Sequence, residues 1–367
     1  MFPKGECLPL KWSIMLAVLW ALGLKADASF RNYLGAYPDT NARAQQEGEL
    51  VIYGVMHADA AVQDLLSHFH ERYQFLNIRN SDGDGAKTYR RFIHEVSEDR
   101  ASADFIWSSA MDLQEKLIND GYSLSYTTPE MTALPSWAHW QNLGYGVTLE
   151  PIAFVYNSRY LTPGEMPRTH AGLDAMLSSQ PTKFLGRVAA YDPEKSEVGM
   201  LLFSQDVRVT KDTWNLFERL GAENAQLYTT SRDMLSAILD GRQWMGYDVI
   251  ASYALELQKT HPELVIVYPT DYVLNLSRVG FITAQAKHPN SAKLFLDFLL
   301  SREGQSILKR HGMGPVRTDL SVPPEQSHID PMRIQAIRIG PGLLSDLDSL
   351  VRAQFLRHWK QARITSG

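Results

Sequence analysis

The sequence predicts an α/β fold with mainly parallel sheets, divided between two domains. Strand-like runs alternate with helix-like runs along the chain, which is typical of parallel sheets covered by helices. The 367 residues are enough for two domains with a large buried core. Beyond the N-terminal region, no long apolar run, internal repeat or low-complexity stretch interrupts this alternation.

The first 28 residues have the plan of a secretory signal peptide. Lysines precede an apolar run at 12–24, and Ala26-Asp27-Ala28 forms a small-x-small cleavage site. The run is shorter than the about 20 residues of a membrane-spanning helix, although an uncleaved anchor is the alternative. Cys7 is the only cysteine and precedes the run, so a chain cleaved after Ala28 has no disulfide. A disulfide-free exported protein suits a bacterial periplasm.

The composition argues against a nucleic-acid partner and against catalysis. The net charge is −5 at pH 7, whereas nucleic-acid binding normally brings a basic excess. A small anionic ligand is still compatible, because a cleft can be locally positive on an acidic protein. Neither a Gly-x-Ser-x-Gly nor a His-Glu-x-x-His motif occurs. The sequence therefore predicts a binding protein with no catalytic residues, no metal and no cofactor.

Three strand–loop–helix units open the first domain. Their strands are expected at 49–54, 75–79 and 104–107, each followed by a polar loop and an amphipathic helix. Residues 148–157 then form one long expected strand, whose Pro151 suits a crossover between domains better than the middle of a sheet.

A second α/β region follows this crossover. Thr230 and Asp233 form a capping box before a helix, and a short strand is expected at 244–247, with Asp248 capping the next helix. A second crossover is expected at 278–283, and the amphipathic helix at 292–300 should return to the first domain. A helix is also expected at 346–360 in the C-terminal tail.

Four stretches of the chain together resemble one known family. They are Glu49 to Ala60 (ELVIYGVMHADA), Ala103 to Ser109 (ADFIWSS), Gly246 to Leu255 (GYDVIASYAL) and Gly280 to Gln305. In order and spacing they are similar to extracellular solute-binding proteins of ABC importers. The branch concerned includes ferric-iron-binding proteins and sugar-phosphate or phosphonate binders. The resemblance covers roughly residues 47 to 315.

The resemblance implies a type II periplasmic binding protein fold, in which two lobes joined by two crossover strands close around a ligand by a hinge. Lobe 1 would comprise 29–147 and 278–314, lobe 2 would comprise 148–277, and the tail at 315–367 would pack on lobe 1. The resemblance also implies a periplasmic location, with a permease and an ATPase at the inner membrane as partners.

The candidate ligand contacts are polar residues near expected strand ends and helix N-termini. Ligands of such folds bind outside the carboxyl ends of the strands, and helix N-termini offer N–H groups to anions. For each candidate, a plain helix cap or a structural role is the alternative. The candidates are His57, Asp59, Ser81, Asp84, Ser108, Ser109, Asp192, Thr229, Thr230, Ser231, Arg232 and Asp248.

This set favours a small solute with an anionic end and a hydroxyl or amino end. Helix N-termini and hydroxyl groups, with Arg232 and Arg278, suit a phosphate, phosphonate or carboxylate. The aspartates would repel a bare anion but accept hydrogen bonds from sugar hydroxyls or an ammonium group. Sugar phosphates, phosphoglycerate-like acids and aminophosphonates meet both conditions.

Two other functions are alternatives. Iron binders of this branch use two adjacent tyrosines, but Ile250-Ala251 stands at that position and Tyr253 is alone nearby. A hard ferric ion needs several anionic oxygen ligands, so ferric iron is the less favoured ligand. The tail beyond the usual family ending suggests instead a sensory protein that presents its ligand to a membrane histidine kinase.

Overall fold

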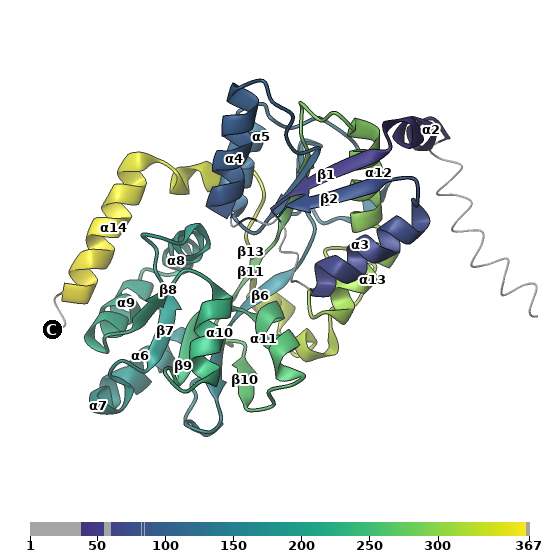
Figure 1. Ribbon diagram of the computed structural model, residues 1–367. Coiled ribbons are helices and arrows are strands. Elements are labelled where there is room, and N and C mark those ends of the chain that lie inside the picture. Colours follow the sequence, from purple (N-terminus) through teal and green to yellow (C-terminus); the bar gives the residue numbers. More distant parts are fainter. Residues whose placement is uncertain (1–37, 55–59, 82, 84, 365–367) are drawn as a thin grey trace, which may run out of the picture.

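Two helix-flanked sheets form two lobes in the computed structural model (Figure 1). The structure describes residues 38–54, 60–81, 83 and 85–364, so the expected signal peptide lies outside it. The predicted two-lobed α/β class is confirmed, but both sheets are mixed rather than mainly parallel. No helix in the described ranges is long and apolar enough to cross a membrane.

The first sheet has the strand order β2-β1-β3-β12-β5-β4. Its parallel part comes from the strand–loop–helix units: β1 (Glu49–Tyr53), β2 (Asn77–Ser81) and β3 (Phe105–Ser108). Its antiparallel part is β12 (Val279–Ile282), β5 (Gly144–Gly146) and β4 (His139–Trp140). The helices of this lobe are α2 (Pro38–Glu47), α3 (Ala60–Arg72), α4 (Gly85–Ser97), α5 (Met111–Asn119), η1 (Pro129–Ala133), α12 (Pro289–Leu300) and α13 (Arg302–Arg310).

The second sheet has the order β13-β11-β6-β9-β7-β8, with β10 also pairing with β6. Its strands are β6 (Glu150–Asn157), β7 (Val188–Tyr191), β8 (Gln226–Tyr228), β9 (Met245–Ile250), β10 (Leu264–Val267), β11 (Val273–Leu276) and β13 (Ile334–Ala336). Its helices are α6 (His170–Ser179), α7 (Pro181–Phe184), α8 (Glu197–Val209), α9 (Thr213–Ala222), α10 (Ser231–Leu239) and α11 (Ala251–Gln258). Every residue of β6 and β9 is buried, which is why both strands are almost continuously apolar.

Before the tail, the chain passes between the sheets twice, from β5 to β6 and from β11 to β12. The two passages lie side by side: the Val147 amide donates to the Arg278 carbonyl at 2.9 Å, and the Arg278 amide donates to Thr148 Oγ1 at 2.9 Å. Strands entering from the other lobe run against their neighbours, so the sheets are mixed at this point.

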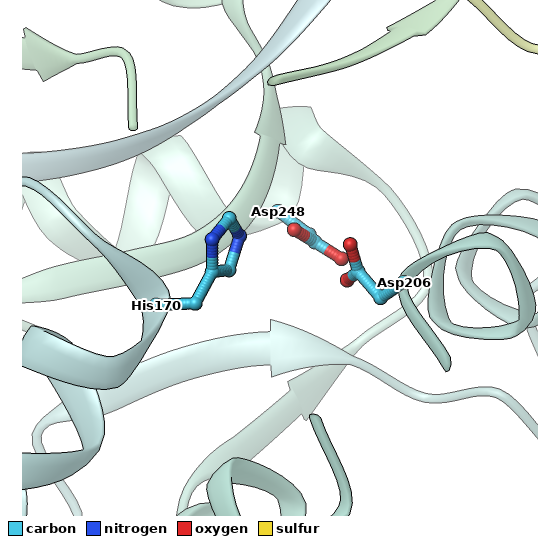
Figure 2. A group of neighbouring side chains, drawn as sticks. All are labelled: His170, Asp206 and Asp248. Carbon is cyan, nitrogen blue, oxygen red and sulfur yellow. The ribbon is translucent and has the colours of Figure 1, made fainter. Parts of the chain in front are cut away.

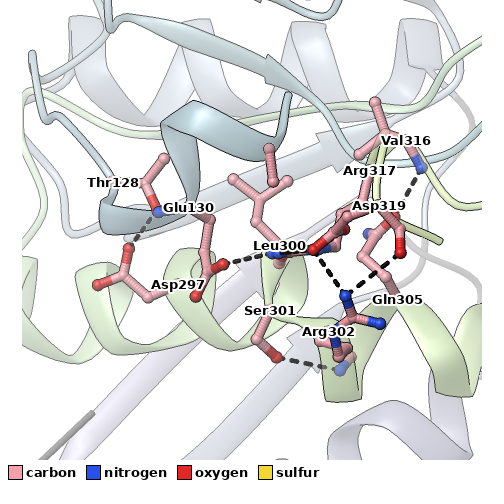
Figure 3. A network of polar contacts seen from close by, with 12 residues as sticks. Thr128, Glu130, Asp297, Leu300, Ser301, Arg302, Gln305, Val316, Arg317 and Asp319 are labelled. Carbon is pink, nitrogen blue, oxygen red and sulfur yellow. Dashed lines mark hydrogen bonds and ion pairs between the residues drawn. The ribbon is translucent and has the colours of Figure 1, made fainter. Parts of the chain in front are cut away.

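A buried arginine fastens the segment after α13 to the first lobe (Figure 3). Arg317 is 8% exposed, pairs with Glu130 and Asp319, and donates to the Leu300 carbonyl at 3.0 Å. Beside it, Gln305 accepts from the Val316 amide at 2.8 Å and donates to the Val147 carbonyl at 2.9 Å. The start of the tail is thereby held on the first lobe, next to the first crossover.

The rest of the tail departs from the expectation. It continues through η2 (Pro324–Gln326) and η3 (Pro331–Arg333), and β13 then pairs in parallel with β11, which adds the tail to the second sheet. The next turn, η4 (Pro341–Asp346), contacts both α5 and α8, and α14 (Ser349–Ile364) packs on α9 (Figure 1). The expected packing of the tail helix on the first lobe is therefore wrong.

The apolar face of α14 explains its place on the second lobe. Trp359 is 1% exposed, and its ring lies 5.3 Å from the rings of both Phe203 and Phe217. Phe355, one turn earlier, contacts the Trp214 ring at 5.1 Å. The sequence predicted a helix here but not the lobe that it contacts.

Replacing Trp359 by alanine should lower the free energy of unfolding by about 3–5 kcal/mol, because it removes a large ring from a packed cluster. Leu350 lies on the same helix and is 78% exposed, so Leu350→Ala is the matched control, with an expected change within about 0.5 kcal/mol. Urea unfolding, monitored by far-ultraviolet circular dichroism so that the signal does not depend on the tryptophan that is removed, would measure the free energy of unfolding of both variants. Similar small losses of stability in the two variants would contradict the packing of Trp359 between α14 and the second lobe.

Candidate functional site

A cavity of about 450 Å³ lies between the two lobes. The first lobe contributes residues of the loops that precede α4 and α5, together with Arg90 of α4. The second lobe contributes the first residues of α8 and α10, the end of β9 and Tyr253 of α11. Arg278, from the second crossover, completes the lining.

The N-terminal ends of helices converge on this cavity because each helix follows a strand of one of the two sheets. The helices α4, α5, α8, α10 and α11 come after β2, β3, β7, β8 and β9, and the carboxyl ends of parallel strands meet at one edge of a sheet. The first turn of a helix has N–H groups without intrahelical partners and carries the positive end of the helix dipole. Such an edge favours a bound anion.

Glycine at position 85 lets two of these helices approach closely. A Cβ at Gly85 would lie 2.2 Å from the Cβ of Ala110, the N-cap residue of α5. A side chain at position 85 would therefore push the start of α4 away from the start of α5. The absence of a side chain is what brings the two helix ends to the same cavity.

Several hydroxyl groups at the cavity already accept hydrogen bonds from backbone amides. Ser108 Oγ accepts from the Ala110 amide at 3.2 Å, and Thr230 Oγ1 caps α10 by accepting from the Asp233 amide at 3.1 Å. Ser231 is 2% exposed; its Oγ accepts from the Ile250 amide at 3.0 Å and lies 2.7 Å from the Tyr191 hydroxyl. Ser231 thus holds the starts of α10 and α11 together beside the cavity.

Among the described residues, the side chains that line the cavity are more basic than acidic. The basic ones are Arg90, Lys195, Arg232 and Arg278, against Glu197 and Asp233. Two guanidinium groups lie against one aromatic ring, since Arg232 Cζ is 4.9 Å and Arg278 Cζ is 5.7 Å from the ring centre of Tyr253. These stacked, delocalised cations can present planar pairs of donors to a phosphate or carboxylate.

Arg278 also belongs to a buried ion pair beneath the cavity. Its Nε donates to Glu150 Oε1 at 2.9 Å, and the two side chains are 6% and 1% exposed. Glu150 also accepts from Thr148 Oγ1 at 2.8 Å and from Ser252 Oγ at 2.5 Å. One buried carboxylate therefore joins both crossovers to the start of α11.

Six of the predicted ligand contacts line the cavity. They are Ser108, Ser109, Thr229, Thr230, Ser231 and Arg232. Three more, His57, Asp59 and Asp84, lie outside the described residues. Ser81 and Asp192 do not line the cavity. Ser81 Oγ accepts from Arg91 at 2.8 Å, while Asp192 accepts from the Glu194 amide and pairs with Lys195 at 3.0 Å.

Asp248 was expected to cap a helix at the cleft, and that expectation is wrong. The strand β9 extends to Ile250, and Ile250 is the N-cap residue of α11. The pairing of β6 with β9 shifts register between Ala153 and Val155, and Asp248 has a φ of 59° at this bulge. The bulge turns the carboxylate into the interior of the second lobe, away from the cavity.

Arg90, Lys195, Glu197 and Tyr191 line the cavity and were missed as candidates. Arg90 lies four residues after Ala86 on α4, so helical spacing from the predicted loop could have identified it. Lys195 follows the predicted Asp192 by three residues, in the same loop. Tyr191 ends the buried strand β7, and nothing in its pattern separates it from other buried tyrosines.

The sequence matches the bacterial extracellular solute-binding proteins over residues 50–314. This chain belongs to that family. It is therefore a binding protein rather than an enzyme. No curated protein matches the sequence.

Solved structures of the same fold include one with substantial sequence identity. A substrate-binding protein of an ABC transporter from Agrobacterium tumefaciens is 31% identical, with a TM-score of 0.80, over 86% of this chain and 94% of that one. Iron-bound HitA of Pseudomonas aeruginosa is 17% identical, with a TM-score of 0.68, over 86% of this chain and 99% of that one. AfuA of Actinobacillus pleuropneumoniae, with fructose 6-phosphate bound, is 19% identical, with a TM-score of 0.69, over 86% and 98%. The last two likenesses concern the fold alone.

Replacing Arg278 by methionine should cost about 3–5 kcal/mol of the free energy of unfolding, because Glu150 would stay buried without its cation. The double variant Glu150→Gln with Arg278→Met should recover most of this loss, since no buried charge is left. Urea unfolding of both variants measures the difference. A single variant as stable as the wild type would contradict the role assigned to this pair.

Buried carboxyl groups also meet beside the cavity, where α5 contacts α8 and η4. Burial raises the pKa of Asp112 to about 7, and the charges of Asp346 and Glu197 add to this rise. Burial likewise raises the pKa of Glu115 to about 7 and that of Asp346 to about 6. Asp112 Oδ2 and both Glu115 oxygens have no hydrogen-bond partner among the described residues.

This carboxyl cluster should make the protein less stable as the pH rises from about 4 to 8. The unfolded chain loses these protons near pH 4, whereas the folded state holds them to about pH 6–7, so ionisation favours unfolding over that range. Asp112→Asn removes the free-energy cost of ionising one buried carboxyl group and should stabilise the protein at pH 8 by up to about 4 kcal/mol. The gain should shrink toward pH 4, as measured by urea unfolding at several pH values. A gain independent of pH would contradict this explanation.

Proposed function

We propose that this chain is the periplasmic substrate-binding component of an ABC transporter, and that it captures a small organic anion between its lobes. The favoured solutes carry a phosphate, phosphonate or carboxylate group, and the partners would be a membrane permease and its ATPase. The observation that carries the proposal is the convergence of helix N-termini and basic side chains on one cavity of about 450 Å³.

The anionic group would bind where these donors meet. Backbone N–H groups at the starts of α5 and α10, with the hydroxyls of Ser109 and Thr229, offer neutral donors, and Arg232 adds a positive charge. Together they favour a group with several acceptor oxygens, as a phosphate or phosphonate has.

The other end of the solute would carry hydrogen-bond donors. Glu197 and Asp233 line the same cavity and accept from hydroxyl or amino groups. A wholly apolar second end would leave these carboxylates desolvated without a partner. Sugar phosphates, phosphoglycerate-like acids and aminophosphonates satisfy both ends.

Ferric iron fits this cavity less well. Ile250 lies at the position where the adjacent tyrosine ligands of iron binders would begin. Burial raises the pKa of the other tyrosine at the cavity, Tyr191, and its hydroxyl lies 2.7 Å from Ser231, so it stays protonated. A hard ferric ion needs several anionic oxygens, whereas the charged side chains that line the cavity among the described residues are mainly cations.

The tail gives no separate support to a sensory role. Its last helix packs on α9 and buries Trp359, so the tail has a structural function within the second lobe.

A thermal-shift screen of residues 29–367 would test the ligand class. The panel would include fructose 6-phosphate, 3-phosphoglycerate, 2-aminoethylphosphonate, dicarboxylates and ferric citrate. A solute that binds the folded state alone raises the melting temperature. We expect the rise with an organic phosphate or phosphonate, and a rise with ferric citrate alone would contradict the proposal.

Arg232→Met should then weaken binding of that solute by about tenfold or more, because a charge-assisted hydrogen bond is lost. Arg100 is exposed on the first lobe and pairs only with Glu98 in the described structure, so Arg100→Gln is the matched control and should bind as tightly as the wild type. Isothermal titration calorimetry measures both affinities. Equal affinities in the two variants would show that the solute binds elsewhere.

A further inference from the structure

A second cluster of chemically active side chains lies inside the second lobe, away from the cavity (Figure 2). His170 begins α6, Asp206 lies on α8 and Asp248 lies on β9. One ligand atom from each lies within 4.8 Å of the other two. The three residues are 9%, 0% and 2% exposed, so bulk water does not screen their charges.

Each of these side chains except Asp248 is held by further hydrogen bonds. Asp206 accepts from the hydroxyl groups of Tyr247 at 2.6 Å and Tyr272 at 2.9 Å. His170 Nδ1 lies 3.0 Å from Asp271, and the His170 ring stacks on Tyr272 at 4.0 Å. With Nδ1 engaged by a carboxylate, Nε2 is the nitrogen available to the cluster, and a ring nitrogen of His170 faces Asp248 in Figure 2.

Asp248 has no such support. Its Oδ2 is buried and has no hydrogen-bond partner among the described residues. No lysine or arginine is among the described residues that line the small space around it. Two buried carboxyl groups therefore face each other without a cationic side chain, which is costly unless something neutralises them.

We propose that His170, Asp206 and Asp248 bind a divalent transition-metal ion, of which Zn²⁺ and Mn²⁺ are the best candidates. Two carboxylates balance the charge of a divalent ion, and Asp248 Oδ2 gains the partner that it lacks. An imidazole nitrogen beside carboxylate oxygens favours a transition metal over Ca²⁺ or Mg²⁺, which prefer oxygen ligands alone.

The surrounding contacts fit a metal site. A carboxylate that holds the second nitrogen of a ligating histidine is a usual partner around protein-bound metals, and Asp271 holds His170 in this way. The tyrosine hydroxyls orient Asp206 similarly. Because the three ligands come from α6, α8 and β9, the ion would join these elements and stabilise the second lobe.

A shared proton is the competing explanation. Burial, followed by the neighbouring Asp206, raises the pKa of Asp248, so a proton could bridge the two carboxyl groups in place of a metal. The facing groups of the neighbouring elements are His170, Tyr247 and Tyr272, none of which supplies a fixed positive charge. The two explanations differ in whether the protein retains metal.

The test is metal retention by the purified protein. Because the site is buried, the protein is unfolded in urea with EDTA, freed of chelator, and refolded at pH 7.5 with or without Zn²⁺ or Mn²⁺. After desalting, inductively coupled plasma mass spectrometry should find about one ion per chain. The loaded form should melt about 5 °C or more above the metal-free form.

Asp248→Asn keeps the shape of the side chain and should abolish both the retained ion and the shift. The metal-free variant should be at least as stable as the metal-free wild type, because one buried carboxylate is gone, so a loss of metal cannot be ascribed to misfolding. His170→Gln should also lose the ion, and Co²⁺ loading should give visible absorption bands in the wild type alone.

The control concerns histidines outside the cluster that could bind metal adventitiously. His311 contacts Asp64 at 3.0 Å, near His68, so His311→Gln should leave the ion and the shift unchanged. If the wild type retains no metal, or if Asp248→Asn retains as much as the wild type, the metal site is wrong. In the first case, a loss of stability with rising pH that is larger in the wild type than in Asp248→Asn would point to the shared proton.

Discussion

The buried pair of Glu150 and Arg278 is the contact on which the two-lobed architecture depends. Apart from the tail, which joins the second sheet at β13, the chain crosses between the lobes at two places in the described structure, and this pair joins those two crossovers beneath the cavity. Among the described residues, Glu150 accepts hydrogen bonds from Thr148, Ser252 and Arg278, so its charge is satisfied although it is 1% exposed. A buried ion pair adds little net stability over an apolar pair of similar size. Removal of one partner is nevertheless strongly destabilising, because it leaves the other charge buried without a counterion.

The same arginine links the hinge to the solute. Arg278 lines the cavity and lies near the ring of Tyr253, which the other stacked cation, Arg232, also contacts. An anion in the cavity would interact with a guanidinium whose position is fixed by both crossovers. Hydrogen-bonded groups in a region of low dielectric constant polarise one another, so the proposed anion binding would be coupled through this one side chain to the geometry of the two crossovers.

Sequence patterns predicted the part of the cavity lining that depends on strand order. Ser108, Ser109 and Thr229 to Arg232 follow strands, and the carboxyl ends of those strands meet at the cavity. Arg278 was recognised as a possible donor, but its partner Glu150 was not. The pairing joins residues 128 positions apart and has no local signal.

The two wrong predictions, for Asp248 and for the packing of the tail helix, also have identifiable structural causes. A strand two residues longer than expected, with a bulge in it, moved Asp248 from a helix cap into the interior. Periodicity predicted the tail helix but cannot say which surface covers it. Trp359 packs against both Phe203 and Phe217, and this contact depends on the shape of the folded second lobe.

The cavity and the interior cluster are mechanically connected because they share two elements. The first turn of α8 lines the cavity, while Asp206 near its other end faces Asp248. Similarly, β9 ends at the cavity with Ile250 and carries Asp248 two residues earlier. Repulsion between the two carboxyl groups would push α8 away from β9 and displace the helix N-terminus offered to the solute. Whatever neutralises the cluster, a cation or a proton, therefore also keeps the donors of the second lobe in place.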